Sequence, residues 1–179
     1  MRRLALLALP LMLAACGDAP GEDGQDTGAE AAPAEDVALD LQGTGIVVPA
    51  QSGFEELAVP FGSSRVPTEA TLGNVLGAVV ETSTTPNDCG LTFTSYDGLT
   101  LNFRDDQFVG YWATTPYSDI GTRAQLLAAE NIAMVEDSTV GEEFTIGDPA
   151  TPVIAGLFTG AGDDAGVEAL WAGENCIPR

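Results

Sequence analysis

The chain has 179 residues, enough for one domain or two small repeated halves, and 45% of them are hydrophobic, enough to form a core. Its formal net charge is −21, it contains no His and no Lys, and all of its basic residues are Arg. A surface this acidic repels phosphate backbones, so we expect no nucleic-acid partner. The absence of His and Lys side chains also excludes Ser–His–Asp and Cys–His catalysis, the usual zinc sites and Schiff-base chemistry.

Residues 1–15 have the form of a secretory signal peptide. The pair Arg2–Arg3 precedes an apolar run over residues 4–13, which is too short to span a bilayer because a spanning helix takes about 20 residues. The next residues, Leu-Ala-Ala-Cys-Gly, resemble the lipobox of bacterial lipoproteins. By this resemblance Cys16 is lipidated after cleavage; an ordinary A-x-A-type cleavage site is the alternative. Because Gly17 and not Asp follows the cysteine, the resemblance implies an outer-membrane anchor facing the periplasm.

The lipidated Cys16 and residues 17–36 are predicted to form a tether. Residues 17–36 include many Gly, Ala, Pro, Asp and Glu and no large apolar residue. Such a segment cannot bury enough apolar surface to offset the entropy lost on ordering. We therefore expect a disordered acidic tether over 16–36 and a folded domain over 37–179.

The folded region is predicted to begin with two short strands. Residues Val37–Val48 alternate loosely, and the first strand is expected at their end, over Thr44–Val48; Leu57–Gly62 forms the second. Pro60 restricts the second strand to the edge of a sheet, because proline cannot donate a backbone hydrogen bond.

A short helix is predicted after these strands. Ser63 or Ser64 offers an N-cap, and Gly77 offers a C-terminal stop. Residues 78–80 then read as extended chain, and residues 82–88 read as a polar turn.

The stretch from Cys89 to Trp112 is predicted to be a three-stranded meander. Asp97–Gly98 between alternating segments indicates a hairpin with a type I′ turn. A second turn is expected at Arg104–Gln107. The third strand, Phe108–Trp112, is predicted to place Phe108, Gly110 and Trp112 on one face and Val109 and Tyr111 on the other.

This meander also supplies the expected interaction surface. We predict that any binding function there uses the polar residues that alternate with the apolar ones. These are Thr92, Thr94, Thr100, Asn102 and Tyr111.

A second helix is predicted to start at Thr122, because Thr122 followed three residues later by Gln125 fits a capping box. This helix is expected to end near Glu130–Asn131. Four further strands are predicted, at Ile132–Val135, Phe144–Ile146, Val153–Phe158 and Val167–Trp171.

A shift of 59 residues aligns parts of the two halves: Asp105 with Asp164, and Trp112 with Trp171. The alignment predicts a two-fold internal repeat with halves at about 44–115 and 116–179; chance similarity between amphipathic strands is the alternative. The predicted fold class is therefore α+β, with antiparallel strand meanders, short helices packed on one face and an internal repeat.

The lipobox, the tether and a Gly-Ser/Thr helix start before a meander resemble small lipoproteins of the BamE/SmpA type. The tandem copy resembles beta-lactamase inhibitor protein, which doubles that unit. The stretches DGLTLNFRDDQFVGYW, IGTRAQL and EALWAGENC also resemble uncharacterised bacterial lipoproteins. The likeness covers about 62–176 and implies a fold but no catalytic residues. The inhibitor family has a disulfide in each half whereas this chain offers one pair, so inhibitor function is not implied.

Cys89 and Cys176 are the remaining cysteines once Cys16 is lipidated. In an oxidising periplasm such a pair indicates a disulfide. A redox or nucleophilic pair is the alternative, although no CxxC motif and no His are present to activate a thiolate.

We therefore expect a non-enzymatic protein-interaction or structural module of the cell envelope, with no cofactor and no metal. Its expected partners are the membrane, through the lipid anchor, and an envelope protein. The alternative is a carboxylate-based hydrolase or a protein that binds a small ligand or carbohydrate. That alternative rests on adjacent acidic pairs and on two tryptophans able to stack on a sugar: Asp105–Asp106, Glu142–Glu143, Asp163–Asp164, Trp112 and Trp171.

Overall fold

The computed structural model describes residues 38–50, 55–148, 150–151 and 153–178. The predictions of a signal peptide, of lipidation at Cys16 and of a tether fall on residues outside this described part. The described part contains eleven strands and two helices.

The N-terminal strands form a small antiparallel sheet of three strands in the order β1-β2-β3. Strand β1 is Asp40–Gln42, β2 is Gly45–Val48 and β3 is Leu57–Pro60. Ile46 and Val59 are buried, because one face of this sheet packs into the hydrophobic core. The sequence predicted β2 and β3 within about two residues but missed β1.

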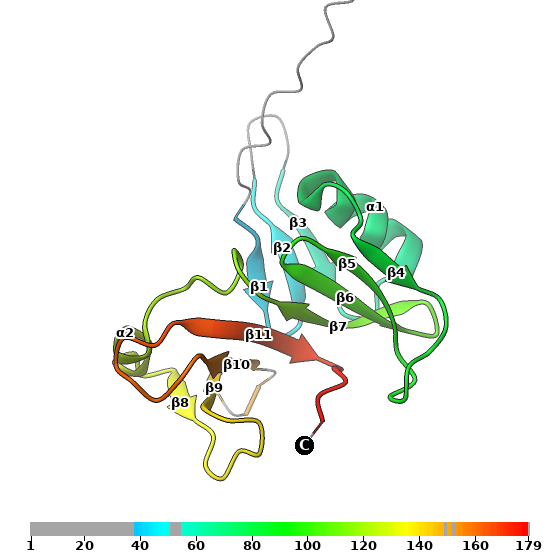
Figure 1. The fold of residues 1–179 in the computed structure, drawn as a ribbon. Coiled ribbons are helices and arrows are strands. Elements are labelled where there is room, and N and C mark those ends of the chain that lie inside the picture. The colour runs from blue at the N-terminus through cyan, green and yellow to red at the C-terminus, as the bar shows by residue number, and fades with distance from the viewer. Residues whose placement is uncertain (1–37, 51–54, 149, 152, 179) are drawn as a thin grey trace, which may run out of the picture. The chain divides into compact units, whose positions relative to one another are not determined.

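All other strands belong to one antiparallel sheet of eight strands in the order β4-β5-β6-β7-β11-β10-β9-β8. Two four-stranded meanders therefore meet through their last strands, β7 and β11 (Figure 1). The strands are β4 Glu81–Ser83, β5 Thr92–Tyr96, β6 Leu99–Arg104, β7 Gln107–Ala113, β8 Ile132–Met134, β9 Glu143–Ile146, β10 Ile154–Phe158 and β11 Val167–Gly173.

One helix precedes each meander. Helix α1, Arg65–Leu76, has 12 residues and precedes β4, whereas α2, Arg123–Leu127, has 5 residues and precedes β8. Helix α1 buries Arg65, Thr68 and Leu72, but α2 buries no residue. Each helix thus lies toward an outer end of the large sheet (Figure 1).

The predicted α+β class with helices packed on one face is wrong, because the fold consists mostly of β-strands. The small sheet packs on the apolar face of the large sheet through Ile46, Val48 and Val59. Phe61 contacts Phe108 and Tyr111 with ring centroids 5.0 and 6.2 Å apart, and the Tyr111 hydroxyl donates to the Gln42 carbonyl at 3.2 Å. The apolar face is therefore covered by the small sheet together with α1, which buries Leu72 and places Arg65 on Phe103.

The turn between β5 and β6 differs in type from the prediction. The hairpin between β5 and β6 turns at Asp97–Gly98 as predicted, but only Gly98 has a positive φ, so the turn is not type I′. The two positive φ angles that type I′ requires occur in the next turn, at Asp105 (50°) and Asp106 (58°). Aspartate tolerates this left-handed region better than most residues, which gives this acidic pair a structural reason.

The predicted faces of β7 are right from Gly110 to Trp112 but wrong for Phe108. A register shift between β6 and β7 makes Phe108 the partner of Phe103 while Gly110 is the partner of Asn102. The extra residue, Val109, forms a bulge that rotates the start of the strand. Phe108 therefore joins Tyr111 in the core, on the opposite face from Trp112.

The remaining predictions of helices and strands agree better with the structure in the second meander than in the first. The strands in the second meander match β8, β9, β10 and β11 within about two residues, and Thr122 and Gln125 form the predicted capping box. Helix α2, however, ends earlier than expected. In the first meander, β4 occupies residues 81–83, which the sequence assigned partly to a turn, and the N-cap Ser64 makes no side-chain cap.

Candidate functional site: a groove between helix α1 and strand β4

A buried arginine anchors α1 to the first meander. Arg65 is the first residue of α1, and its backbone N–H donates to the Asp106 carbonyl at 2.7 Å. Its guanidinium lies 4.7 Å from the centre of the Phe103 ring, a cation–π contact. The guanidinium also donates to hydroxyl and carbonyl oxygens of β4 and β5 at 2.9–3.1 Å: Thr82 Oγ1, Thr92 Oγ1, Thr94 Oγ1 and the Phe93 carbonyl.

Glu69 lies one turn further along α1 and completes this cluster. Its Oε1 accepts from Arg65 Nε at 2.8 Å and from Thr94 Oγ1 at 2.5 Å. Within the described part of the chain, no group donates to Glu69 Oε2. The side chain is 30% exposed, so this second oxygen is open to a ligand or to water.

A groove of about 450 Å³ opens beside Glu69, between α1 and the edge of the large sheet. Its lining combines apolar groups with a few polar ones, as ligand sites commonly do. The lining residues are Val66, Glu69, Ala70, Gly73, Gly77, Val79, Thr82, Thr94 and Tyr96.

The Tyr96 ring forms part of the groove floor. Burial, and after it the charge of Glu69, raise the pKa of Tyr96 above its ordinary value, although Arg65 acts in the opposite direction. Tyr96 therefore keeps its proton at neutral pH. No hydrogen bond to this hydroxyl comes from the residues described in the structure, so it is available as a donor or acceptor.

Two exposed valines, Val66 and Val79, line the groove, and a third, Val80, follows Val79 in the chain. Val66 on α1 is 77% exposed, and Val79 and Val80, just before β4, are 51% and 70% exposed. The other exposed large hydrophobic side chains in the described ranges are Leu57 and Ile120, at 50% and 41%. Clustered exposed apolar groups of this kind mark interaction surfaces more often than scattered ones do.

Strand β4 is an edge strand. It pairs with β5 on one side and with no described strand on the other. An edge strand presents backbone N–H and C=O groups that an added strand can use. In β4 the Ser83 carbonyl also accepts from the Arg65 guanidinium at 3.4 Å. The groove therefore places an open strand edge beside apolar and acidic side chains.

The structure divides the five residues of the expected interaction surface between the two faces of the sheet. Thr92 and Thr94 pair with Phe103 and Leu101, so they lie on the core face, where both bind Arg65. Tyr111 is fully buried on that same face. The other two, Thr100 and Asn102, lie on the opposite face. Only Thr94 lines the groove.

The predicted disulfide is present on the side of Asn102. The Cys89 and Cys176 sulfur atoms lie at bonding distance, with the Cα atoms 5.7 Å apart. The bridge holds the C-terminal segment, where Asn102 Nδ2 donates to Asn175 Oδ1 at 2.7 Å and Arg104 pairs with Glu174 at 2.6 Å. Through these contacts Asn102 and Arg104 hold the C-terminal segment and form part of the scaffold.

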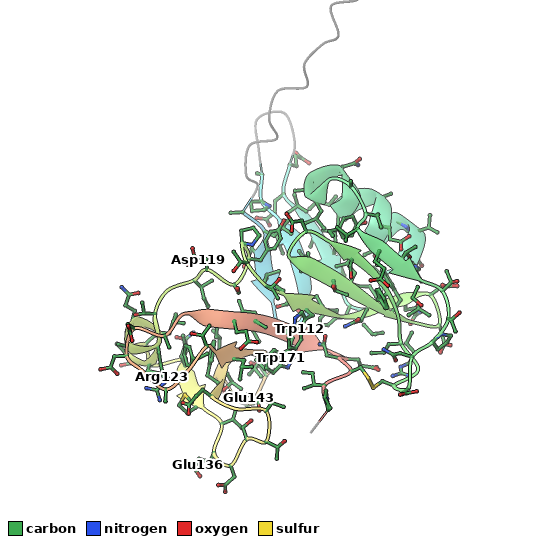
Figure 2. The ribbon with its side chains drawn as sticks, viewed as in Figure 1. Trp112, Asp119, Arg123, Glu136, Glu143 and Trp171 are labelled. Carbon is green, nitrogen blue, oxygen red and sulfur yellow. A yellow bond between two sulfur atoms is a disulfide. The ribbon has the colours of Figure 1, made fainter. Side chains whose placement is uncertain are left out.

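The two tryptophans meet where the meanders join. Trp112 and Trp171 are register partners, and their rings stack with centroids 5.0 Å apart and an interplanar angle of 11° (Figure 2). Each ring thus covers one face of the other, and Trp171 is only 6% exposed. A sugar-stacking platform needs an open ring face, which this pair offers poorly.

The acidic pairs of the sequence have different surroundings. Asp105 and Asp106 form the turn described above. Glu142 lies 3.5 Å from Arg123, while Glu143 is buried and accepts from Ser138 Oγ at 2.6 Å. In the described residues, no group of three or more His, Cys, Asp or Glu side chains is arranged to hold a metal ion.

A second hollow of about 570 Å³ lies beside Phe61, Val153 and Gly173. None of the described residues that line it is charged, and Thr44 is the polar side chain among them. The α1–β4 groove, by contrast, has Glu69, Thr82, Thr94 and Tyr96.

Comparison with protein-family models, curated proteins and solved structures found no match to this chain. The resemblance to BamE/SmpA-type lipoproteins and to beta-lactamase inhibitor protein stays a prediction. Among the described helices, none has the length and apolar character needed to cross a membrane.

Sequence reasoning missed the groove because it assigned residues 82–88 to a turn, which left no strand edge beside α1. One signal was nevertheless present. Arg65 and Glu69 are four residues apart in a predicted helix, the spacing of an ion pair, and Arg65 is one of the few cations in a very acidic chain. That signal pointed to a structured helix face at the place where the groove lies.

Proposed function

We propose that this chain is a lipoprotein of the bacterial cell envelope, anchored through Cys16 at the outer membrane and facing the periplasm. Its folded domain acts as a non-enzymatic module that binds an envelope protein. The lipobox-like sequence around Cys16 supports the anchor, and the disulfide fits an oxidising compartment. The absence of His and Lys supports a binding role over catalysis.

The binding site of this module is the α1–β4 groove. The observation that carries this proposal is the concentration of exposed Val66, Val79 and Val80 beside the unpaired edge of β4. An exposed apolar strand edge promotes unwanted association, so it is unfavourable in a protein that has no binding partner. A partner that covers the groove removes this cost.

Site-specific photocrosslinking in living cells tests the proposal. A photoreactive amino acid is placed at Val66 or Val79, and the matched control carries it at Leu57, which is 50% exposed on β3. We expect both groove positions, and not the control, to crosslink to the same envelope protein, identified by mass spectrometry. Equal labelling from all three positions, or none from the groove, would contradict the proposal.

A further inference from the structure

We propose that the α1–β4 groove binds an extended, basic peptide segment, which adds to β4 as a further strand and directs a Lys or Arg side chain to Glu69. This inference rests on the proposed function and names the chemistry of the partner. It joins two features of one site: the open edge of β4 and the free carboxylate oxygen of Glu69.

The strand edge determines how the segment lies. A strand added to β4 runs about 4.8 Å from it, with alternate side chains on opposite faces of the sheet. Thr82 of β4 faces α1, since it pairs with Thr94 and its hydroxyl accepts from Arg65. The residue of the added strand that pairs with Thr82 therefore also faces α1, beside the groove.

The charges determine which side chain fits. Glu69 is the acidic group of the groove lining, whereas Glu81, next to Thr82 on β4, lies on the opposite face of the sheet. The nearest cation, Arg65, is buried and already engaged by Glu69, Thr82 and Thr94. The other two arginines in the described part of the chain pair elsewhere, Arg104 with Glu174 and Arg123 with Glu142. A basic side chain thus finds a free carboxylate oxygen, whereas an acidic side chain finds no free cationic donor among the described residues that line the groove.

The floor and the rim add further selectivity. The Tyr96 hydroxyl has hydrogen-bonding capacity to spare, which suits the N–H groups of an incoming side chain or backbone. Val66 and Val79 offer apolar contacts on either side. Apolar residues two positions before and after the basic residue share its face of the strand, so they meet these valines.

The probe is the fluorescein-labelled, amidated peptide Ser-Val-Thr-Lys-Thr-Val-Ser, titrated by fluorescence anisotropy against the full-length protein purified from membranes in detergent. We expect it to bind about ten- to a hundredfold more tightly than the same peptide with Glu in place of Lys, as for a hydrogen-bonded charge. Equal affinity of the two peptides, or no binding of the Lys peptide, overturns the proposal.

Backbone N-methylation tests strand addition. Only alternate residues of an added strand direct their N–H groups to β4. N-methylation of one alternate set of residues should therefore abolish binding, while methylation of the other set is tolerated. Two N-methylated peptides that both bind like the parent, or that both fail, rule out strand addition.

Charge substitutions at the rim locate the site without disturbing the fold. Val66 is highly exposed, so Val66→Lys and Val66→Glu should fold normally. We expect Val66→Lys to lower the affinity for the Lys peptide, and Val66→Glu to raise it, by about two- to fivefold each, as for a surface charge pair. Leu57→Lys and Leu57→Glu serve as controls and should leave affinity unchanged. If the Leu57 variants behave like those at Val66, the groove is not the site.

The two proposals fail in different ways. If these peptides show no selectivity but crosslinks in cells still form from Val66 and Val79, the module binds a partner by other chemistry and only the present inference is lost. If the peptides bind as expected but no crosslink forms in cells, the proposal of an envelope partner is contradicted, and the proposal that the groove binds a basic peptide stands.

Discussion

Arg65 Nε donates to Glu69 Oε1 at 2.8 Å within helix α1, while the same guanidinium reaches the hydroxyls of three threonines on β4 and β5. One side chain thereby connects the helix, the edge strand and its neighbour. The position of the groove depends on this connection, because the groove lies between the elements that Arg65 ties together.

Replacing this arginine should loosen the helix. Arg65→Met removes the hydrogen bonds and leaves the Glu69 charge without its partner. We expect the free energy of unfolding in urea to fall by about 2–3 kcal/mol, a value moderated by the partial exposure of Glu69. Arg65→Lys keeps the charge but not the planar fork, so it should recover only part of the loss. Wild-type stability of Arg65→Met would show that the network does not hold α1.

The disulfide should stabilise the domain through its long loop. Cys89 and Cys176 are 87 residues apart, and closing a loop of this length restricts the unfolded chain. We expect the double variant Cys89→Ala, Cys176→Ala to lose about 2–5 kcal/mol of unfolding free energy. Dithiothreitol should lower the melting temperature of the wild type and leave that of the variant unchanged. A similar response of both proteins would argue against a stabilising bridge.

Alkaline pH should destabilise the fold through Tyr111. Burial, and after it the charge of Asp40, raise the pKa of Tyr111 well above its ordinary value. The folded state therefore favours the neutral phenol, and this contribution is complete below about pH 10, the pKa of an unfolded tyrosine. Above that pH we expect unfolding free energy to fall, by up to about 1.4 kcal/mol per pH unit for this group.

The variant that tests this assignment is Tyr111→Phe. Its free energy of unfolding in urea is measured between pH 8 and pH 11 and compared with that of the wild type. It should lose about 1 kcal/mol at pH 8, because the hydrogen bond to the Gln42 carbonyl disappears. Its stability should also fall less steeply above pH 10, with Tyr96 accounting for part of the remaining slope. Identical slopes in the two proteins would contradict the assignment.

Glycine should stabilise the β6–β7 turn. Asp106 has a φ of 58°, a conformation that glycine adopts without steric cost. We expect Asp106→Gly to raise the unfolding free energy by about 0.5–1 kcal/mol. Asp97→Gly is the control, since Asp97 has no positive φ and glycine there only increases the freedom of the unfolded chain. A gain from both substitutions would mean that backbone strain is not the cause.

The anchor prediction is tested by metabolic labelling with an alkyne-bearing fatty acid. The wild-type protein should incorporate the label and fractionate with outer membranes, whereas Cys16→Ser should incorporate none. Cys89→Ser, with Cys16 intact, should be labelled normally. Equal labelling of the wild type and Cys16→Ser would exclude lipidation at this cysteine.

Local signals predicted local structure well. The Thr122–Gln125 capping box and the position of the Asp97–Gly98 hairpin depend on residues a few positions apart, so the sequence contains all the information needed. The Cys89–Cys176 pairing followed from counting cysteines.

Features that depend on distant partners were missed. The Val109 bulge arises where β6 meets β7, and it moved Phe108 to the face opposite the one predicted. The short β4 is a strand because β5 pairs with it, since Glu81-Thr82-Ser83 has little strand character of its own. The groove depends on the placement of β4 beside α1, and for that reason no local pattern revealed it.

The most direct test of the groove as a binding surface is amide hydrogen exchange of the full-length protein, with and without the Lys peptide. We expect the peptide to slow exchange in residues 79–83 and 66–73 and to leave the distant β8–β9 region unchanged. Slowed exchange elsewhere, with no change along β4, would contradict the proposal.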